Sequence, residues 1–128
     1  MEATIHRPDK PQHQMVLRPI NKLVLMRLPG GQVLTESQNA IRLIEIGKTI
    51  YDPVIYLPRG DIMAELIRET KTTECPLKGT ASYFGIEDCG KSHESIAWSY
   101  LDPFDFAKKI KGLMAFYPDR VIVEEHPV

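Results

Sequence analysis

Short apolar runs separated by turn residues are the feature of this chain that most constrains its fold. Turn signals recur about every eight to twelve residues, a spacing typical of all-β sandwiches and barrels. No segment alternates strands with long helices, as a parallel sheet would require. We therefore predict a mainly β domain of antiparallel strands. The predicted strands cover residues 22–28, 32–36, 40–46, 53–57, 81–86, 95–100, 113–117 and 121–124.

Two short helices are predicted among these strands. Residues 61–67 carry apolar side chains four apart, and Asp61 stands in the first turn, where a carboxylate suits the positive end of a helix. Residues 103–110 follow as a second short helix, with Pro103 at its first position and the flanking aspartates as caps.

The segments between these elements also carry expectations. Residues 1–14 are polar, contain two prolines and predict an arm, flexible or lying along the surface, in front of a single domain at 15–128. Polar residues 71–79 predict a loop. The last two strands, 113–117 and 121–124, are expected to pair as a hairpin.

Composition limits the classes of partner. The chain has 128 residues, 43% of them hydrophobic and 26% charged, with a net charge of -1, which is typical of one globular domain. Such a charge predicts no broad attraction to nucleic acid or to a membrane surface.

No signal peptide or apolar run of spanning length is present, so we expect a cytoplasmic monomer or homodimer. Cys75 and Cys89 form no CxxC pair, so we expect reduced thiols, no metal and no cofactor.

Several short motifs follow one another over about residues 22–124. They are Thr35-Glu36-Ser37, Glu45, Tyr56-Leu57-Pro58 with Asp61, Cys75-Pro76-Leu77-Lys78-Gly79, Ala81 with Tyr83, Ala97-Trp98-Ser99-Tyr100 with Pro103, and Ala115-Phe116-Tyr117-Pro118-Asp119. With these motifs in this order, the chain resembles the domain of unknown function 427 family. The resemblance implies a β-tent fold, in which two antiparallel sheets meet at one edge and enclose a pocket. A nucleotidyltransferase label is sometimes attached to this family.

The residues themselves do not support nucleotidyl transfer. That reaction normally needs two or three carboxylates gathered on a metal, often beside a glycine-rich phosphate loop. The sequence contains no closely spaced acidic pair on an apolar strand, and Gly30-Gly31 has the character of a hairpin turn.

Cys75 and Lys78 are the candidate reactive pair. An ammonium near a thiol favours the nucleophilic thiolate, and three residues within one loop place both side chains within reach of one cavity. The alternative is a buried, inert Cys75 beside a Lys78 that pairs with an acid.

Glu45 is the second candidate. It stands between Ile44 and Ile46, so we expect it to be partly buried and to need a partner such as Lys78 or Arg59.

Aromatic residues form the third candidate group. Trp98 and Tyr100 alternate onto one face of a strand, and Tyr83 lies on the strand expected to pair with it. Rings with polar tips suit the wall of a ligand pocket, and they equally suit a sheet core. We expect Tyr83 to share the face of Trp98, and these rings to converge with Cys75 and Lys78 on one partly open cavity.

Three functions remain open at this point. The first is a small-molecule-binding domain with an aromatic pocket anchored by Lys78 and Glu45. The second is a small enzyme that uses Cys75 or Lys78 as a nucleophile or acid/base group. The third is a structural or protein-interaction domain. The predicted ligand-binding residues are Glu45, Cys75, Lys78, Tyr83, Trp98 and Tyr100.

Overall fold

Strands dominate the structure, a computed structural model that describes residues 4–128. Strands hold 57% of the chain and helices 7%, which confirms the predicted mainly β class. Both helices are short 3₁₀ helices, η1 (Arg59–Asp61) and η2 (Asp105–Ile110). The strands are β1 (Ile5–Arg7), β2 (Lys10–Pro19), β3 (Leu23–Arg27), β4 (Val33–Ser37), β5 (Ile41–Ile46), β6 (Val54–Tyr56), β7 (Ile67–Cys75), β8 (Gly79–Asp88), β9 (Lys91–Ser99), β10 (Met114–Phe116) and β11 (Ile122–His126).

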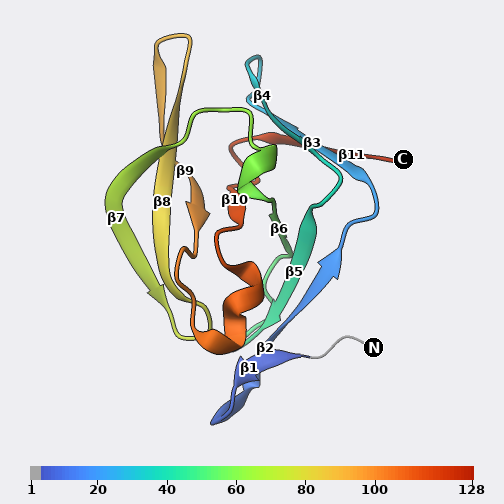
Figure 1. Cartoon of the computed structure of the whole chain (residues 1–128), viewed down its shortest axis with the longest axis vertical. Coiled ribbons are helices and arrows are strands. Elements are labelled where there is room, and N and C mark those ends of the chain that lie inside the picture. The colour runs from blue at the N-terminus through green and yellow to red at the C-terminus, as the bar shows by residue number, and fades with distance from the viewer. Residues whose placement is uncertain (1–3) are drawn as a thin grey trace.

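The strands form three antiparallel sheets, and the expectation of two sheets was therefore wrong. The first sheet has the order β1-β2-β5-β6, the second β10-β9-β8-β7 and the third β11-β3-β4. Figure 1 shows the second sheet standing opposite the first, with the third at the upper end of the molecule. Within residues 4–128 no helix has the length and apolar character needed to cross a bilayer.

The first and second sheets are joined at one edge. Just after β6, the Leu57 N–H donates to the Met114 carbonyl and the Met114 N–H donates to the Leu57 carbonyl, each over 2.8 Å. This pair of hydrogen bonds brings the end of β6 against the start of β10. The two sheets then diverge from this seam, and η2 lies between them in Figure 1.

Two apolar clusters form the core. The first includes Val24, Leu34, Phe84 and Ile96 and lies against the third sheet. The second includes Met15, Leu43, Tyr56 and Tyr83 from the first and second sheets. The strands of the second sheet contribute side chains to both clusters, so this sheet is the common wall of the fold.

Residues of the expected flexible arm are paired in the first sheet. β1 pairs with β2, and residues 14–19 of β2 pair with β5, so residues 5–7 and 10–14 lie in strands of the first sheet. Residues 1–3 of that expected arm lie outside the described residues.

The helix expected at 61–67 is absent from the structure. Only η1 forms there, and the chain then extends, with a bridge between Ile62 and Thr35. Ile62 and Leu66 both pack on the first core cluster from this extended segment, which explains their spacing without a helix. The second helix begins at Asp105, later than expected, and no side chain caps its start at Phe104.

Two further expectations about connections were wrong. Residues 71–75 extend β7, and only 76–78 turn toward β8. β7 is an edge strand that is exposed along most of its length, so its sequence lacks the alternation that burial of one face would impose. The last two strands do not pair with each other, because β10 joins β9 and β11 joins β3.

Candidate functional site

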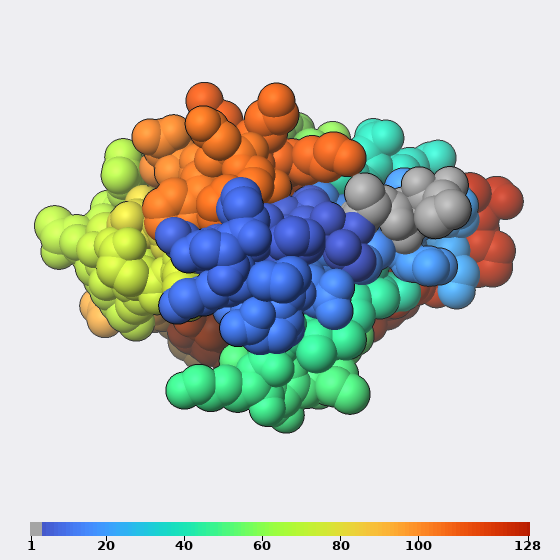
Figure 2. Space-filling view, turned by 90° about the horizontal axis from the view of Figure 1, so that it is seen from below, coloured from blue at the N-terminus to red at the C-terminus, as the bar shows by residue number. Residues whose placement is uncertain are grey.

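A pocket of about 930 Å³ opens between the β1–β2 hairpin, the loop that follows β5, and the β7–β8 turn. Figure 2 shows the β1–β2 hairpin, in blue, lying across this end of the molecule between η2, in orange, and the loop after β5, in green. Three of the six predicted site residues line the pocket, namely Glu45, Cys75 and Lys78.

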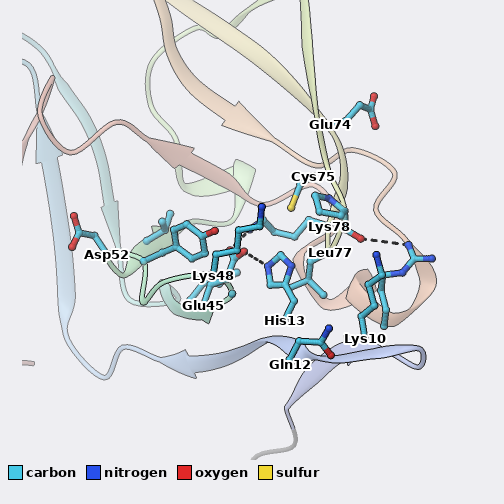
Figure 3. Close-up of a pocket in the computed structure, with 16 residues that line it drawn as sticks. Lys10, Gln12, His13, Glu45, Lys48, Asp52, Glu74, Cys75, Leu77 and Lys78 are labelled. Carbon is cyan, nitrogen blue, oxygen red and sulfur yellow. Dashed lines mark hydrogen bonds and ion pairs between the residues drawn. The ribbon is translucent and has the colours of Figure 1, made fainter.

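Glu45 lies at the centre of the polar lining. Its Oε2 accepts a hydrogen bond from His13 Nε2 at 2.6 Å, and its Oε1 accepts one from Lys78 Nζ. Figure 3 shows the three side chains meeting from different segments of the chain. Both carboxylate oxygens are thus engaged, and only 12% of the Glu45 side chain is exposed. The expectation that Glu45 is partly buried and paired is confirmed, and its partner is Lys78 rather than Arg59.

Strand pairing explains why Glu45 points into the pocket. Met15 of β2 stands directly opposite Glu45 of β5, and Leu17 stands opposite Leu43. Met15 and Leu43 belong to the second core cluster, so this face of the first sheet is its inner face. Side chains alternate along a strand, and Glu45 therefore shares that inner face. His13 lies two residues before Met15 and reaches Glu45 diagonally across the pair.

The ring of His13 is seated against Gly47. A Cβ at position 47 would lie 3.2 Å from His13 Cδ2 and 3.2 Å from a ring carbon of Tyr51. Both rings therefore use the space that a side chain at Gly47 would fill. This close approach holds His13 beside the end of β5, within reach of Glu45.

The β7–β8 turn positions Lys78. Cys75 pairs with Gly79 at the base of the turn, and the Lys78 carbonyl accepts a hydrogen bond from the Phe104 N–H at 3.1 Å. The Lys78 side chain is 9% exposed and its ammonium lies 5.7 Å from the centre of the Tyr100 ring. The turn is therefore docked on the segment before η2 and aims Lys78 inward at Glu45.

Opposing effects act on the pKa of Glu45. Burial raises the pKa, because a charged carboxylate loses water, while the hydrogen bonds from Lys78 and His13 lower it. The hydrogen bonds and the positive charge prevail, and the pKa is lower than its ordinary value of 4.5. Glu45 is therefore ionised at neutral pH, and the charge of buried Lys78 is balanced.

The three predicted aromatic residues lie elsewhere. Tyr83 stands directly opposite Trp98 across β8 and β9, so the expected shared face is confirmed. Tyr83 and Tyr100 nevertheless belong to the second core cluster, Trp98 packs against it, and none of the three is among the residues that line the pocket. The expectation that they form its wall was wrong, because the first sheet and the β7–β8 turn provide the lining.

A network of aromatic contacts surrounds Trp98 within this cluster. Trp98 Nε1 donates to the Tyr56 hydroxyl at 3.2 Å, and the Trp98 ring lies 4.6 Å from that of Tyr117. Burial raises the pKa of Tyr56 and Tyr100 well above the ordinary value of 10, and it raises that of Tyr117 to about 12. These hydroxyls are neutral at physiological pH, and that of Tyr56 accepts the hydrogen bond from Trp98.

The polar groups at the centre of the pocket form one connected network beside a thiol. Glu45 links a buried ammonium to an imidazole that is 24% exposed, and Cys75 adds a thiol to the same pocket. Among residues 4–128 no group of three histidine, cysteine or acidic side chains lies close enough to hold a metal ion.

His13 was missed by the sequence reasoning. The polar stretch around it suggested an arm, and only its pairing beside β5 brings it to Glu45. Arg7 and Lys10 of the pocket lining were missed for the same reason, and Lys48, in the loop after β5, was missed as well. The apolar run Met15-Val16-Leu17 indicates a strand, but it does not alternate with polar residues and so does not show which face His13 takes.

The comparisons with known proteins identify the family. The family described as a domain of unknown function (DUF427) matches the chain over residues 17–126. The chain belongs to the DUF427 family. No curated protein shows significant similarity to it.

The DUF427 match covers part of the pocket. Glu45, Cys75 and Lys78 lie inside the matched residues, whereas His13 lies in front of them. In this DUF427 domain, the centre of the pocket therefore combines two groups from the matched region, Glu45 and Lys78, with His13 from the part of β2 that lies before the match.

Proposed function

We propose that this DUF427 domain binds a small molecule in the pocket between the β1–β2 hairpin and the β7–β8 turn. The observation that carries the proposal is the His13–Glu45–Lys78 network at the centre of that pocket. Burial of a charged pair costs free energy that better-packed apolar residues would avoid. The Lys78–Glu45 pair lies in the wall of a pocket of about 930 Å³, and this position supports a role in ligand binding rather than in stability alone.

The remaining lining suits a ligand with an apolar part. Leu43, Val54 and Leu77 line the same pocket as the polar network. Apolar walls with a few fixed polar groups are typical of small-molecule sites, where the polar groups set orientation and the walls supply contact area. Tyr56, Tyr100 and Trp98 support this wall from the core and do not themselves contact the ligand in this proposal.

The β-tent architecture belongs to the same proposal. The hydrogen-bonded seam between Leu57 and Met114 joins the first and second sheets at one edge, and the sheets diverge from it around the second core cluster. A pocket at the open end of two joined sheets is the arrangement that this fold implies.

A pair of matched variants tests the proposed function. Gln12 is exposed and lines the pocket, so Gln12→Trp fills the mouth at little cost to the core. Gln38 is also exposed but lies outside the pocket, so Gln38→Trp is the control. Thermal unfolding is followed against a panel of metabolites. Binding of a ligand raises the melting temperature by mass action.

We expect at least one metabolite to stabilise the wild type and Gln38→Trp, and to leave Gln12→Trp unchanged. A panel in which no compound stabilises the wild type would contradict the proposal. Compounds that stabilise both variants equally would also contradict it, because they would bind away from this pocket.

A thiol enzyme is a second candidate, and one observation favours it. Cys75 lines the pocket together with Lys78, as a reactive thiol would. Cys75 is half-buried whereas Cys89 is exposed, so access alone predicts faster alkylation of Cys89 by iodoacetamide. Faster alkylation of Cys75, measured by peptide mass spectrometry, would support the enzyme, and slower alkylation would argue against it.

A further inference from the structure

The acidic side chains of the pocket are engaged or directed elsewhere. Both oxygens of Glu45 accept hydrogen bonds from basic groups. Glu74 accepts a hydrogen bond from Thr80 Oγ1 at 2.8 Å, and Figure 3 shows its carboxylate turned away from Glu45. The carboxylate of Asp52 likewise points away from Glu45 at the opposite side of that view. Glu45 therefore has no free carboxylate oxygen to offer a ligand, and the carboxylates of Glu74 and Asp52 lie apart from it.

The basic side chains have the opposite arrangement. Arg7, Lys10 and Lys48 line the pocket in addition to Lys78. Lys78 is neutralised by Glu45, and Arg7 is paired with Asp9 at 3.3 Å. In the described part of the chain, neither Lys10 nor Lys48 forms a salt bridge. Figure 3 shows these two lysines on either side of His13.

We propose that the pocket binds a small organic anion, whose negative charge is attracted by Lys10 and Lys48 at the mouth. The proposal rests on the proposed binding function and specifies the charge of the ligand. An organic cation would meet an excess of positive charge, and Glu45 would have to give up Lys78 or His13 to receive it. Loss of that partner would leave the buried ammonium of Lys78 uncompensated, which is strongly unfavourable.

Cys75 offers a direct measure of the charge that a ligand would meet. Iodoacetate and iodoacetamide alkylate a thiolate in the same way, with loss of iodide, but only iodoacetate carries a negative charge. The ratio of their rates at Cys75 therefore reports the electrostatic potential inside the pocket. Cys89, exposed in the β8–β9 turn, provides the reference within the same molecule. Each rate is measured by peptide mass spectrometry at low ionic strength.

We expect the iodoacetate-to-iodoacetamide ratio at Cys75 to exceed that at Cys89 about fivefold, the effect of one unit charge near 4 Å in water. Lys48→Met and Lys10→Met should each lower the ratio at Cys75, because methionine keeps the stem and loses the charge. Lys22→Met, on an exposed residue outside the pocket, should leave it unchanged. Added salt should lower the ratio by screening the attraction.

An equal or lower ratio at Cys75 would overturn the proposal, as would a ratio insensitive to both pocket lysines. Failure of both reagents to label Cys75 would also overturn it, because the pocket would then be closed to a molecule the size of acetate. The alkylation rates are measured without a ligand, so they test the charge of the pocket independently of the metabolite panel. If a neutral or cationic metabolite stabilised the protein and the iodoacetate-to-iodoacetamide ratio at Cys75 were low, small-molecule binding would be supported. The proposal that the ligand is an anion would then be contradicted.

Discussion

At the scale of single residues, the inward direction of Glu45 decides the chemistry of the pocket. Its neighbours Ile44 and Ile46 point the other way, and Ile46 is 41% exposed. A charged residue thus takes an inner position while an isoleucine takes an outer one, which reverses the usual preference. The hydrogen bonds to Lys78 and His13 make this arrangement stable.

Glu45→Gln should lower the free energy of unfolding by about 3 kcal/mol at pH 7, because it leaves Lys78 buried beside a neutral partner. The pKa of Glu45 is lower in the folded state than its ordinary value of 4.5, so the carboxylate stabilises the fold above about that pH. The contribution is lost as the pH falls further. We therefore expect the difference in free energy of unfolding between wild type and Glu45→Gln to be smaller at acidic pH than at neutral pH, as measured by urea unfolding.

Glu36→Gln is the matched control for that experiment, because Glu36 is exposed on β4. Its stability should follow the wild type at every pH. If the difference in free energy of unfolding between wild type and Glu45→Gln stayed constant on acidification, the ionised carboxylate would not be what stabilises the site.

At the scale of elements, the β7–β8 turn connects the pocket to the core. Gly79 follows Lys78 with a φ of 113°, a conformation that residues with a side chain rarely adopt. A Cβ there would also lie 3.4 Å from the backbone of Pro103 and Phe104. The turn can therefore dock on the segment before η2 and present Lys78 inward only with glycine at this position.

Gly79→Ala should lower the free energy of unfolding by about 2 kcal/mol, through backbone strain and the tight contact. Gly60→Ala is the control, because a Cβ at Gly60 meets nothing within 4 Å. Chemical denaturation of both variants provides the measurement. Equal stability of the two variants would mean that neither the conformation nor the contact at Gly79 constrains the turn.

At the scale of the whole molecule, the second core cluster joins the pocket side of the first sheet to the second sheet. Tyr56 comes from β6, Tyr83 from β8, and Tyr100 follows β9, and all three are buried there. Burial raises the pKa of Tyr56 and Tyr100 because the phenolate would lose its water. Packing of this cluster therefore favours the protonated hydroxyls of Tyr56 and Tyr100.

The stability of the fold should consequently fall as the pH rises above about 10. Unfolded tyrosines ionise near that pH, whereas Tyr100 keeps its proton in the folded state, so the unfolded state is favoured at higher pH. Tyr100→Phe should make the decline shallower, and Tyr51→Phe, at a residue that is 42% exposed, should not. Unfolding followed by circular dichroism between about pH 9 and 11 tests this, and identical declines in both variants would contradict it.

The sequence by itself determined much of the local structure. The β3–β4 and β8–β9 hairpins follow from apolar runs that flank turn residues, and the common face of Tyr83 and Trp98 follows from their alternation. Three pocket residues, Glu45, Cys75 and Lys78, were also recognisable, because a carboxylate within an apolar strand and a thiol near an amine are signals carried by neighbouring residues.

Only the tertiary structure decided which of these segments meet. β7 is an exposed edge strand without a buried face, so its strand character comes from pairing with β8 rather than from its own pattern. His13 becomes part of the site because β2 pairs with β5. Tyr100 belongs to the second core cluster, whereas the pocket is lined largely by residues of the first sheet and the β7–β8 turn. Contacts between distant segments depend on how the sheets pack, and local periodicity does not encode that packing.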